Sequence, residues 1–422
     1  MEAPVFTGEL ELTAPIAGIR LPERTDGVPY TGVYLLVRLQ RVPVGYVFLR
    51  PDDLDPAGIA RQVWEQLSTE ISRHYVRAGL PAADALPVGG LTAQAALDSD
   101  IPDRPLVSVV ICTRNRPGSI LVALRSLLAM RYQPFEIVVV DNAPSSDETR
   151  AAVLAAYGED PRVRYVREPR PGLSCARNRG LAEAAADIVA FTDDDVTVDP
   201  WWLDGILRGF HAAPDVACVT GMIATAQLEN TAQLYFHLGS AWGTVREGRV
   251  FDMAENRLDT PLYPFCPGAL GAGANFAVSR AAMAKIGGFD EALGSGTPAA
   301  GGEDLEMFMR ILLSGNRIAR EPSAIVWHHH RSEMAELVRQ RRAYGTGLTA
   351  AFTAILLRSS RARRGLPSRC LHVLLRVIAL RNRVKDAPAV PDDLFGRELR
   401  GMLIGPWLYL KGRRHIPVLR SA

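Results

Sequence analysis

The sequence has little of what marks disulfide-stapled, zinc-bound or membrane-spanning proteins. Its 422 residues include 5 cysteines, an odd number with no Cys-x-x-Cys pair, which argues against a disulfide framework and a zinc cluster. No segment supplies the roughly 18 uninterrupted apolar residues that a spanning helix needs. The first residues have neither the basic start nor the apolar run of a secretory signal. We therefore expect a protein that stays in the reducing cytoplasm.

The chain as a whole has almost no excess of one charge, whereas its C-terminal part is strongly basic. The 48 Lys and Arg residues oppose 46 Asp and Glu residues, which gives a net charge of +2. Residues 331–422 hold 19 basic and 6 acidic residues, a net charge of +13, which leaves −11 for residues 1–330. Such asymmetry is found in proteins that bind nucleic acid, an anionic membrane face or an acidic ligand.

Length and composition indicate a soluble globular chain of two or three domains. Hydrophobic residues make up 48% and charged residues 22%, which is compatible with a large buried core. We expect an accessory α+β region over 1–100, a principal domain over 105–345 and a basic helical extension over 346–422. In the first region the β-rich runs, which predict a hairpin, are 33–38 and 44–49, and the helical run is 57–77.

Beyond residue 105, apolar strand-like runs alternate with helical runs. The strand-like runs are 107–113, 135–142, 163–166, 188–191, 275–278 and 324–327, and the helical runs are 119–130, 147–157, 174–186 and one that begins near 303. This alternation predicts an α/β domain whose parallel sheet is covered on both faces. Because ligands bind such sheets at the carboxyl ends of the strands, we expect Thr113, Asp141 and the aspartates at 193–195 to surround one crevice.

Asp193, Asp194 and Asp195 follow the apolar run IVAFT. Three adjacent carboxylates repel one another unless a cation or solvent relieves them, and magnesium or manganese binds such oxygens and bridges them to phosphate. A solvated acidic turn ahead of a helix near residue 200 is the alternative. The position at the end of a strand in a parallel sheet favours the divalent cation.

Two further segments near the strand ends suit a nucleotide. Asp141 fits turn and cap chemistry as well as it fits acceptance of a hydrogen bond from a ring N–H of a bound base. The run RPGLSCARNRG joins a glycine loop to a helix start, where backbone N–H groups with Arg170 or Arg177 can hold a pyrophosphate. An ordinary loop-to-helix junction with solvated arginines is the alternative.

Glu303 and Asp304 follow the flexible run GSGTPAAGG and open a helix. Carboxylates are common in a first helical turn because of the helix dipole, but a glycine-hinged loop that delivers a carboxylate also suits a general base. His328, His329 and His330 follow a strand, where neighbouring side chains alternate in direction. At most His328 and His330 can therefore share a metal or phosphate site.

The ordered motifs between residues 105 and 342 resemble the inverting glycosyltransferases of family 2, which have the nucleotide-diphospho-sugar transferase, or GT-A, fold. The matching segments are PLVSVVICTRNRP, VVVDNAPSSDET, GLSCARNRGL, IVAFTDDDV, GAGANFAVSR, GGFDE, GGEDLEMFMRILLSGNRI and IVWHHHR. They follow the family's order and cover more than half of the chain. The resemblance implies a GT-A type, mostly parallel sheet flanked by helices, and an enzyme that transfers a hexose or a related sugar.

The resemblance assigns five residues to the nucleotide-sugar donor. Thr113, Asn115 and Asp141 match positions that hold the nucleoside. Arg177 and Asn178 match the Ala-Arg-Asn element that lies beside the nucleotide. The implied donor is therefore a sugar carried on a nucleoside diphosphate.

The resemblance also implies a divalent metal, magnesium or manganese. Asp193 and Asp195 match the two aspartates of the DxD element, which contact the ribose and the metal on the diphosphate, with Asp194 between them. His328 or His330 matches a histidine that completes the metal site in some members. Val196 and Thr197 depart from the family's pattern, because many members have further polar groups at these two positions.

A catalytic base is the last implied role. Asp304 matches the acidic residue that removes the proton of the acceptor hydroxyl, and Glu303 precedes it. Inversion then follows from one in-line displacement at the anomeric carbon. The glycine-rich loop 287–302 is expected to act as a lid that excludes water.

The basic tail adds an expectation about the acceptor. The run CLHVLLRVIALRNRVK mixes apolar and basic residues and suits the interface of an anionic leaflet. We expect peripheral contact with the inner face of the membrane and an acceptor hydroxyl that is lipid-linked or membrane-assembled, the alternative being a helix packed on the catalytic domain. Because the tail lacks interleaved aromatic residues for base stacking, no nucleic-acid partner is expected.

Two rival functions use the same type of sheet. A catalytically silent nucleotide- or carbohydrate-binding protein is one, since a fold does not fix a function. The presence of all three acidic elements, at 141, 193–195 and 304, argues against it. A sugar-phosphate nucleotidyltransferase is the other, but the run RNRPGS does not resemble the triphosphate loop that such an enzyme needs.

Overall fold

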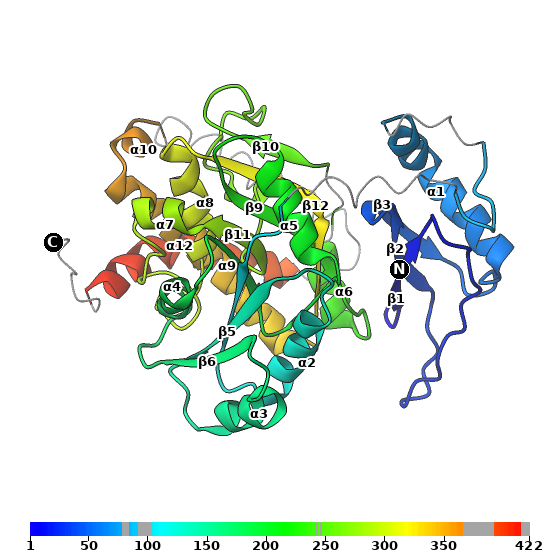
Figure 1. Ribbon diagram of the computed structural model, residues 1–422, viewed down its shortest axis with the longest axis horizontal. Helices are drawn as coiled ribbons and strands as arrows, with labels where there is room; N and C mark the ends of the chain where they lie inside the picture. Colours follow the sequence, from blue (N-terminus) through cyan, green and yellow to red (C-terminus); the bar gives the residue numbers. More distant parts are fainter. Residues whose placement is uncertain (78–83, 92–102, 241–243, 245–246, 366–391, 415–422) are drawn as a thin grey trace. The chain divides into compact units, whose positions relative to one another are not determined.

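The computed structural model describes residues 1–77, 84–91, 103–240, 244, 247–365 and 392–414. The chain forms two compact units (Figure 1). The smaller unit comprises Met1–Asp103, Met222–Glu247 and Trp327–Met334, and the larger comprises Arg104–Gly221, Gly248–Val326 and Ala335–Ala422. The partition into an accessory region, a principal domain and a basic extension stays a prediction.

The smaller unit is built on a three-stranded sheet and one long helix. Its elements are β1 (Phe6–Glu11), β2 (Val33–Leu39), β3 (Val42–Leu49), α1 (Pro56–Arg77) and α6 (Thr231–Gly239). The predicted hairpin and helix are confirmed, and β1, which was not predicted, pairs parallel to β2. The hairpin turns at Gln40 and Arg41, both with positive φ, as a two-residue turn with matching twist requires. Apolar residues of β2, β3 and α1 form its core.

The segment Met222–Glu247 is held to the N-terminal strands by hydrogen bonds. The Val5 N–H donates to the Leu228 carbonyl at 2.9 Å, and the Thr7 hydroxyl donates to the Ala226 carbonyl at 2.7 Å. The Asn230 side chain caps α6 by accepting from the Gln233 N–H. A segment far along the chain is thereby part of the N-terminal unit.

A nine-stranded sheet organises the larger unit in the order β10-β12-β9-β11-β7-β4-β5-β6, with β8 paired to β12. The strands are β4 (Val107–Thr113), β5 (Phe135–Asn142), β6 (Val163–Glu168), β7 (Ile188–Asp193), β8 (Val196–Val198), β9 (Val216–Thr225), β10 (Arg249–Phe251), β11 (Asn275–Ser279) and β12 (Arg317–His328). Neighbours among β7, β4, β5 and β6 are parallel, whereas β11 is antiparallel to β7 and β9. The predicted parallel sheet is confirmed for the half that carries the site.

Helices cover both faces of the parallel strands. In Figure 1, α2 and α3 lie on one side of β5 and β6, and α4 lies on the other, which is the arrangement that right-handed crossovers produce. The helices are α2 (Pro117–Leu128), α3 (Glu148–Tyr157), α4 (Leu173–Glu183), α5 (Trp202–His211), η1 (Pro267–Ala269), α7 (Arg280–Ile286), α8 (Glu303–Leu313), α9 (Met334–Arg358), α10 (Ser360–Gly365) and α12 (Asp392–Arg413).

The close fit between α4 and β4 has a local cause in the sequence. Every residue of β4 is buried, as its unbroken apolar run predicts for a strand covered on both faces. Gly180 faces Val110, and a Cβ at this glycine would collide with the valine methyl groups. The helix can therefore lie close to the strand only because residue 180 has no side chain. This contact holds the second half of α4 against the middle of β4.

The described part of the basic extension is helical, and its two long helices pack through glycines. A Cβ at Gly345 of α9 would collide with the Glu398 carbonyl of α12, and one at Gly401 would collide with the Arg342 carbonyl. The amphipathic helix expected over 370–383 lies outside the described residues. No described helix is both long enough and apolar enough to cross a membrane.

Candidate active site

The triplet of aspartates lies where β7 ends, next to the loop that follows β4. The Thr113 hydroxyl donates to Asp194 at 2.7 Å, and the Arg116 guanidinium contacts Asp194 at 2.8 Å and Asp195 at 3.2 Å. Asp194 is buried, whereas Asp193 and Asp195 are partly exposed. The parallel register of β4 and β7 brings these groups together, as the sequence predicts. Asp193 and Asp195 thus remain accessible to a ligand.

Arg177 is a buried cation that joins the strand ends to the start of α8. Its guanidinium lies 2.8 Å from Glu303 and 3.5 Å from Asp193, and it donates to the Gly273 carbonyl at 2.9 Å. Its side chain is only 3% exposed and lies over the rings of two phenylalanines. Arg177 is therefore a buried residue of the site that holds the segments of Asp193 and Glu303 together.

These contacts define one acidic cluster with too few cations. The cluster consists of Asp193, Asp194, Asp195, Glu303 and Asp304 together with Arg116 and Arg177. Five carboxylates against two guanidinium groups leave a formal excess of three negative charges. Burial raises the pKa of Asp193 to about 7, and the neighbouring aspartates add to the shift while Arg177 opposes it. The cluster is short of positive charge.

Glu303 and Asp304 differ in what they contact. Glu303 is buried and forms an ion pair with Arg177, whereas Asp304 is partly exposed and accepts only from backbone N–H groups, including that of Leu305 at 2.8 Å. Burial raises the pKa of both carboxyl groups, and Arg177 lowers it. A Cβ at Gly273 would lie 3.0 Å from Asp304 Oδ2, so the glycine keeps this oxygen uncrowded. Asp304 is the more accessible of the two.

Asp141 lies at the end of β5 with one oxygen that has no protein partner. The Tyr165 hydroxyl donates to Oδ2 at 2.7 Å, while Oδ1 is buried and accepts no hydrogen bond within the described chain. Burial raises the pKa of Asp141, and the Tyr165 hydrogen bond lowers it. Asp147, not Asp141, precedes α3. The cap alternative is therefore wrong for Asp141, which instead presents an unmet acceptor.

Asn115 shapes the loop between β4 and α2. Its φ is +55°, a conformation that asparagine tolerates better than most residues, and its side-chain oxygen accepts from the Ser145 N–H at 2.9 Å. Ser145 follows β5, so this hydrogen bond joins the loops after two adjacent strands. Asn115 thereby holds both loops at the edge of the same crevice.

Arg170, the other candidate for pyrophosphate, is engaged with carboxylates. It contacts Glu168 at 3.0 Å and Glu291 at 3.0 Å. The side chain of Asn142 donates to the Arg170 carbonyl at 2.8 Å and accepts from the Gly172 N–H at 2.9 Å. The loop ahead of α4 is thus fixed by Asn142, and neither Arg170 nor Arg177 extends without a partner toward solvent.

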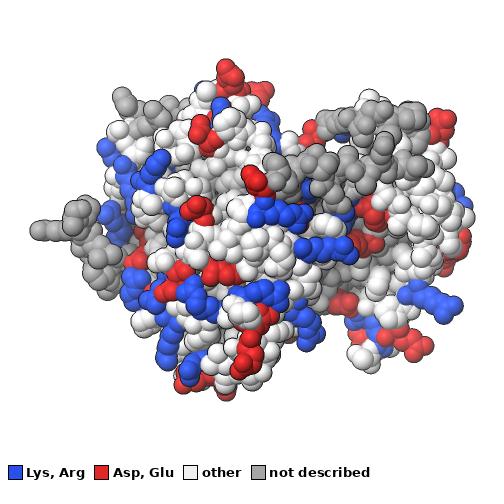
Figure 2. Space-filling model, viewed as in Figure 1, with Lys and Arg blue, Asp and Glu red and all other residues white. Residues whose placement is uncertain are grey.

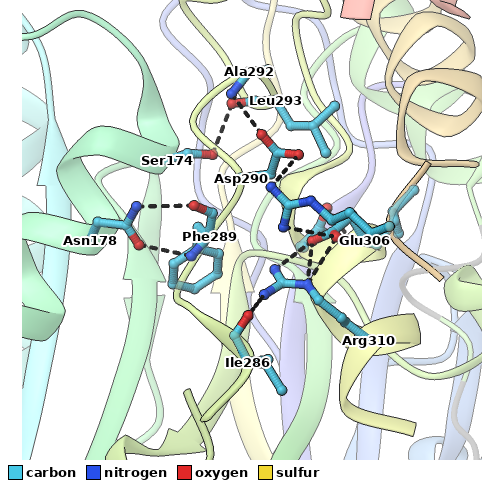
Figure 3. A network of polar contacts seen from close by, with 12 residues as sticks. Ser174, Asn178, Ile286, Phe289, Asp290, Ala292, Leu293, Glu306 and Arg310 are labelled. Atoms are coloured by element: carbon cyan, nitrogen blue, oxygen red, sulfur yellow. Dashed lines mark hydrogen bonds and ion pairs between the residues drawn. The ribbon is translucent and has the colours of Figure 1, made fainter. Parts of the chain in front are cut away.

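The loop 287–302 is held against α4 by hydrogen bonds. Asn178 donates to the Phe289 carbonyl at 3.0 Å and accepts from the Phe289 N–H at 2.8 Å, and the Ser174 hydroxyl donates to the Leu293 carbonyl at 2.8 Å (Figure 3). The amide of Asn178, which the resemblance places beside the nucleotide, is directed at this loop. Asn178 therefore positions the segment that leads to Glu303.

The opposite side of the same loop is held by the C-terminal helices. Asp290 forms an ion pair with Arg358 of α9 at 2.9 Å and accepts from the Tyr409 hydroxyl of α12 at 2.8 Å. Arg310 of α8 contacts Glu306 and donates to the Ile286 carbonyl, just before the loop (Figure 3). The loop expected to act as a lid is therefore tied down on both sides in this structure.

The histidines lie in the smaller unit and form a cluster of their own. The Nδ1 atoms of His328 and His330 are 2.8 Å apart, so the two predicted partners do contact each other. His330 Nε2 lies 3.2 Å from the Thr225 hydroxyl, which in turn lies 2.8 Å from His237 Nδ1. The Phe236 ring stacks on His328. Both ring nitrogens of His330 are thus occupied, and a metal-binding role for His328 and His330 stays a prediction.

Sequence reasoning missed several positioning residues. Arg116 lies three positions after Thr113 in the run TRNRP, and its place just past a strand end is a signal that could have identified it. Asn142 follows Asp141 and carries the same signal. Asp290 and Arg358 lie far apart in the chain, and their pairing has no signature in one sequence. Among the described residues, no three His, Cys, Asp or Glu side chains are arranged to hold a metal ion.

The sheet order and the acidic residues at its strand ends define an α/β domain of the GT-A type. Residues 108–280 match the family model described as glycosyl transferase family 2. The matched segment, 173 of the 422 residues, is thus similar to glycosyltransferase family 2, as its motifs indicate. The residues that follow 280, including Glu303 and Asp304, lie outside the matched segment.

Curated relatives carry related names. The chain is 28% identical over 246 residues to the pre-mycofactocin glycosyltransferase of Mycobacterium tuberculosis, an alignment that covers 58% of this chain and 47% of that protein. It is 32% identical over 120 residues to the glucosyl-dolichyl phosphate glucuronosyltransferase of Haloferax volcanii, with 28% and 38% covered. The chain thus spans less than half the length of these relatives.

A similar solved structure is a mannosyltransferase from Pyrobaculum calidifontis in complex with GDP-Man and Mn2+. It is 18% identical to this chain, with a TM-score of 0.49, and the match covers 83% of this chain and 98% of that one.

Proposed function

We propose that this protein transfers a sugar from a nucleoside-diphosphate sugar to an acceptor hydroxyl, with inversion at the anomeric carbon. The observation that carries the proposal is the acidic cluster, whose carboxylates converge at the carboxyl ends of parallel strands with too few cations. Ligands of such sheets bind at this edge. A cationic or metal-bearing ligand relieves the excess negative charge. A site with a purely structural role would have no need of such an excess.

Donor binding is supported by groups with unmet bonding capacity. The buried Asp141 Oδ1 has no partner within the described chain and suits a ring N–H of a base. Thr113 and Asn115 lie in or next to the loop beside it, and Arg116 is the cation closest to the aspartates on the exposed side. These groups support a nucleoside-diphosphate sugar as the donor.

The donor set of the acidic cluster suits magnesium or manganese. Asp193 and Asp195 supply hard carboxylate oxygens that are partly exposed, and Asp195 accepts from Arg116 at 3.2 Å. When bound there, a divalent cation neutralises charge on the departing diphosphate. The neighbouring residues hold these two carboxylates in place, since Asp194 is fixed by Thr113 and Arg116.

Asp304 is proposed as the base that removes the proton of the acceptor hydroxyl. Its raised pKa makes the ionised carboxylate a stronger base than an exposed aspartate. Glu303 is bound to Arg177 and serves to position the start of α8. The acceptor oxygen attacks the anomeric carbon as the bond to the diphosphate breaks, and the proton passes to Asp304.

The loop 287–302 is proposed to cover the reacting groups, and its contacts with Asn178, Arg358 and Tyr409 set its position.

The basic extension suits an acceptor hydroxyl on a membrane lipid or on a membrane-assembled polymer. Contact with the inner face of the membrane is part of this proposal.

Calorimetric titration with a panel of nucleoside diphosphates, with and without manganese, tests the donor site. The test variant is Asp195→Ala, and the matched control is Asp187→Ala, which alters a 96% exposed aspartate just before the other end of β7. We expect one or two nucleoside diphosphates to bind the wild type and the control in a manganese-dependent manner. Asp195→Ala should weaken this binding by about a hundredfold.

The outcome separates the proposal from its rivals. Binding of no nucleoside diphosphate under either condition would contradict the transferase proposal. Binding without release of nucleoside diphosphate from any sugar donor, in the presence of water or acceptor extracts, would favour the silent-binding alternative. Preference for a nucleoside triphosphate with a sugar phosphate would favour the nucleotidyltransferase.

A further inference from the structure

The C-terminal helix α12 has one face that packs and one face that does not. The packed face is formed by glycines and one aromatic residue, namely Gly401, Gly405, Tyr409 and Gly412, which are all buried. Cβ atoms at Gly401 and Gly405 would collide with the backbone of α9, so this face has to be flat. Its orientation is therefore fixed by close packing, and the residues on the opposite face are held outward.

The outward face carries a stripe of large apolar side chains. Leu399, Leu403, Trp407 and Leu410 are 40%, 77%, 62% and 45% exposed. Their spacing of four, four and three residues places them along one side of a helix. Large apolar residues are seldom left this exposed in a row on a soluble monomer, and such a row marks an interaction surface.

Basic residues flank this apolar stripe. Arg400, Lys411, Arg413 and Arg414 are all exposed, and the Lys411 ammonium lies 5.5 Å from the centre of the Trp407 ring. The one acidic residue between 396 and 414 is Glu398, which lies inward, 3.9 Å from Arg341. By contrast, Figure 2 shows Lys and Arg interspersed with Asp and Glu over the face that it presents.

We propose that the outward face of α12 binds the surface of an anionic lipid bilayer. The leucines and Trp407 enter the boundary between headgroups and acyl chains, and the flanking cations contact anionic headgroups. A bilayer supplies an apolar layer and negative charge side by side, which matches the stripe and its flanks. A second copy of the chain would offer the same cations and so would repel them. The proposal is independent of the run at 370–385, which lies outside the described residues and on which the sequence-based expectation depended.

The inward face of the same helix contacts the loop that leads to the proposed base. Tyr409 donates to Asp290, and a Cβ at Gly412 would lie 3.2 Å from the Ala292 carbonyl. Docking of α12 would therefore hold the loop 287–302 one helix diameter, roughly 10 Å, from the bilayer. This second step deepens the proposed function, on which it rests, because it makes a membrane-borne acceptor hydroxyl the natural substrate class.

Vesicle sedimentation of the full chain, without donor, tests the docking surface. The vesicles are pure phosphatidylcholine or phosphatidylcholine mixed with phosphatidylglycerol, at low and high salt. The apolar variant is Leu403→Gln with Trp407→Gln, and the charge variant is Arg400→Gln with Lys411→Gln. The matched control is Val122→Gln with Leu154→Gln, which alters two apolar residues of similar exposure, 47% and 44%, on α2 and α3.

We expect the wild type and the control to bind the anionic vesicles only, and high salt to weaken this binding. Each α12 variant should bind at least about tenfold more weakly. Brominated lipid should quench the tryptophan fluorescence of the wild type, and Trp407→Phe should remove that quenching. Circular dichroism and nucleoside diphosphate binding show whether each variant keeps its fold.

Four results would overturn the proposal. The first is failure of the folded wild type to bind anionic vesicles, and the second is equal binding to pure phosphatidylcholine. The third is unchanged binding by both α12 variants, which would assign the contact to another part of the chain. A change from dimer to monomer in light scattering of the variants would also contradict it, because a second copy would then cover the stripe. None of these results depends on catalysis, so they do not decide the donor and base assignments.

Discussion

The acidic cluster of the larger unit and the histidine cluster of the smaller unit, formed by His237, His328 and His330 with Thr225 and Phe236, are both buried polar assemblies. The acidic cluster holds five carboxylates and two guanidinium groups, so acidic side chains outnumber basic ones among its members. In the histidine cluster, burial lowers the pKa of His237 to about 4 and that of His330 still further. These imidazoles are therefore neutral near pH 7.

The difference indicates which cluster was shaped by a ligand. Buried charge without a partner is costly, so an unbalanced cluster persists only where function requires it. A neutral network whose nitrogens and hydroxyls satisfy one another costs little and stabilises the core that contains it. We therefore propose ligand chemistry for the acidic cluster. The paired imidazoles stabilise the smaller unit, and a metal-binding role for His328 and His330 stays a prediction.

The largest expected effect separates the two neighbouring carboxylates at the start of α8. Asp304→Asn should lower the rate of nucleoside diphosphate release by about a thousandfold, because the base is lost while the shape is kept. Glu303→Gln should cost only about tenfold, since Glu303 acts through Arg177. In the wild type, activity should rise with pH through the raised pKa of Asp304, and Asp304→Asn should lack this limb. An inactive Glu303→Gln beside an active Asp304→Asn would reverse the assignment.

The next effect concerns stability and the buried cation. Arg177→Gln leaves Glu303 and Asp193 without their shared guanidinium, and we expect a loss of about 3–5 kcal/mol in the free energy of unfolding. The control is Arg170→Gln, whose side chain is 49% exposed, and its cost should stay below about 1 kcal/mol. Urea denaturation measures both. Equal costs would mean that the cluster is not held from beneath by Arg177.

The histidine network should have an acid-sensitive stability. The pKa of His237 is lowered to about 4 in the folded protein, whereas the ordinary pKa of histidine is about 6.5. Below about pH 6.5 the unfolded chain therefore binds more protons at this residue than the folded protein does. Stability is therefore lost as the pH falls from about 6.5 toward 4, by at most about 3 kcal/mol. His237→Gln should reduce the slope of unfolding free energy against pH between about 5 and 7 by up to one proton. An unchanged slope would mean that His237 is not buried in neutral form.

The acidic cluster should show the opposite dependence. The pKa of Asp193 is raised in the folded protein, so its contribution is favourable below the unfolded value and is lost as the pH rises through the folded one. Asp193→Asn should therefore stabilise the ligand-free protein at pH 8 by about 1–2 kcal/mol, while it weakens donor binding. Asp187→Asn, at an exposed site, is the control. Destabilisation by Asp193→Asn would show that the cluster is already compensated without a ligand.

The sequence was informative where local pattern determines structure. The unbroken apolar run of β4 predicted a strand buried on both faces, and the strand ends then predicted that Thr113 lies beside the aspartates at 193–195. In the antiparallel half, the runs at 275–278 and 324–327 were predicted as strands, but β8, β9, β10, the full length of β12 and the antiparallel pairing were not. These strands connect distant segments, and such pairings leave no local signature. The same reason hid the contact of Asp290 with Arg358 and Tyr409. Long-range pairing, and not local conformation, limited what could be predicted from the sequence.

The smallest effect tests one of these long-range contacts. Tyr409→Phe removes a buried hydrogen bond of 2.8 Å to Asp290 but leaves the Arg358 ion pair, so we expect a loss of about 1 kcal/mol in unfolding free energy. Because Asp290 anchors the loop before Asp304, kcat should fall a few fold while the KM for the donor stays the same. Tyr30→Phe removes a comparable hydroxyl contact, to Glu229 in the smaller unit, and should leave kcat unchanged. A loss of stability in Tyr409→Phe without any change in kcat would mean that α12 supports the fold but does not position the base.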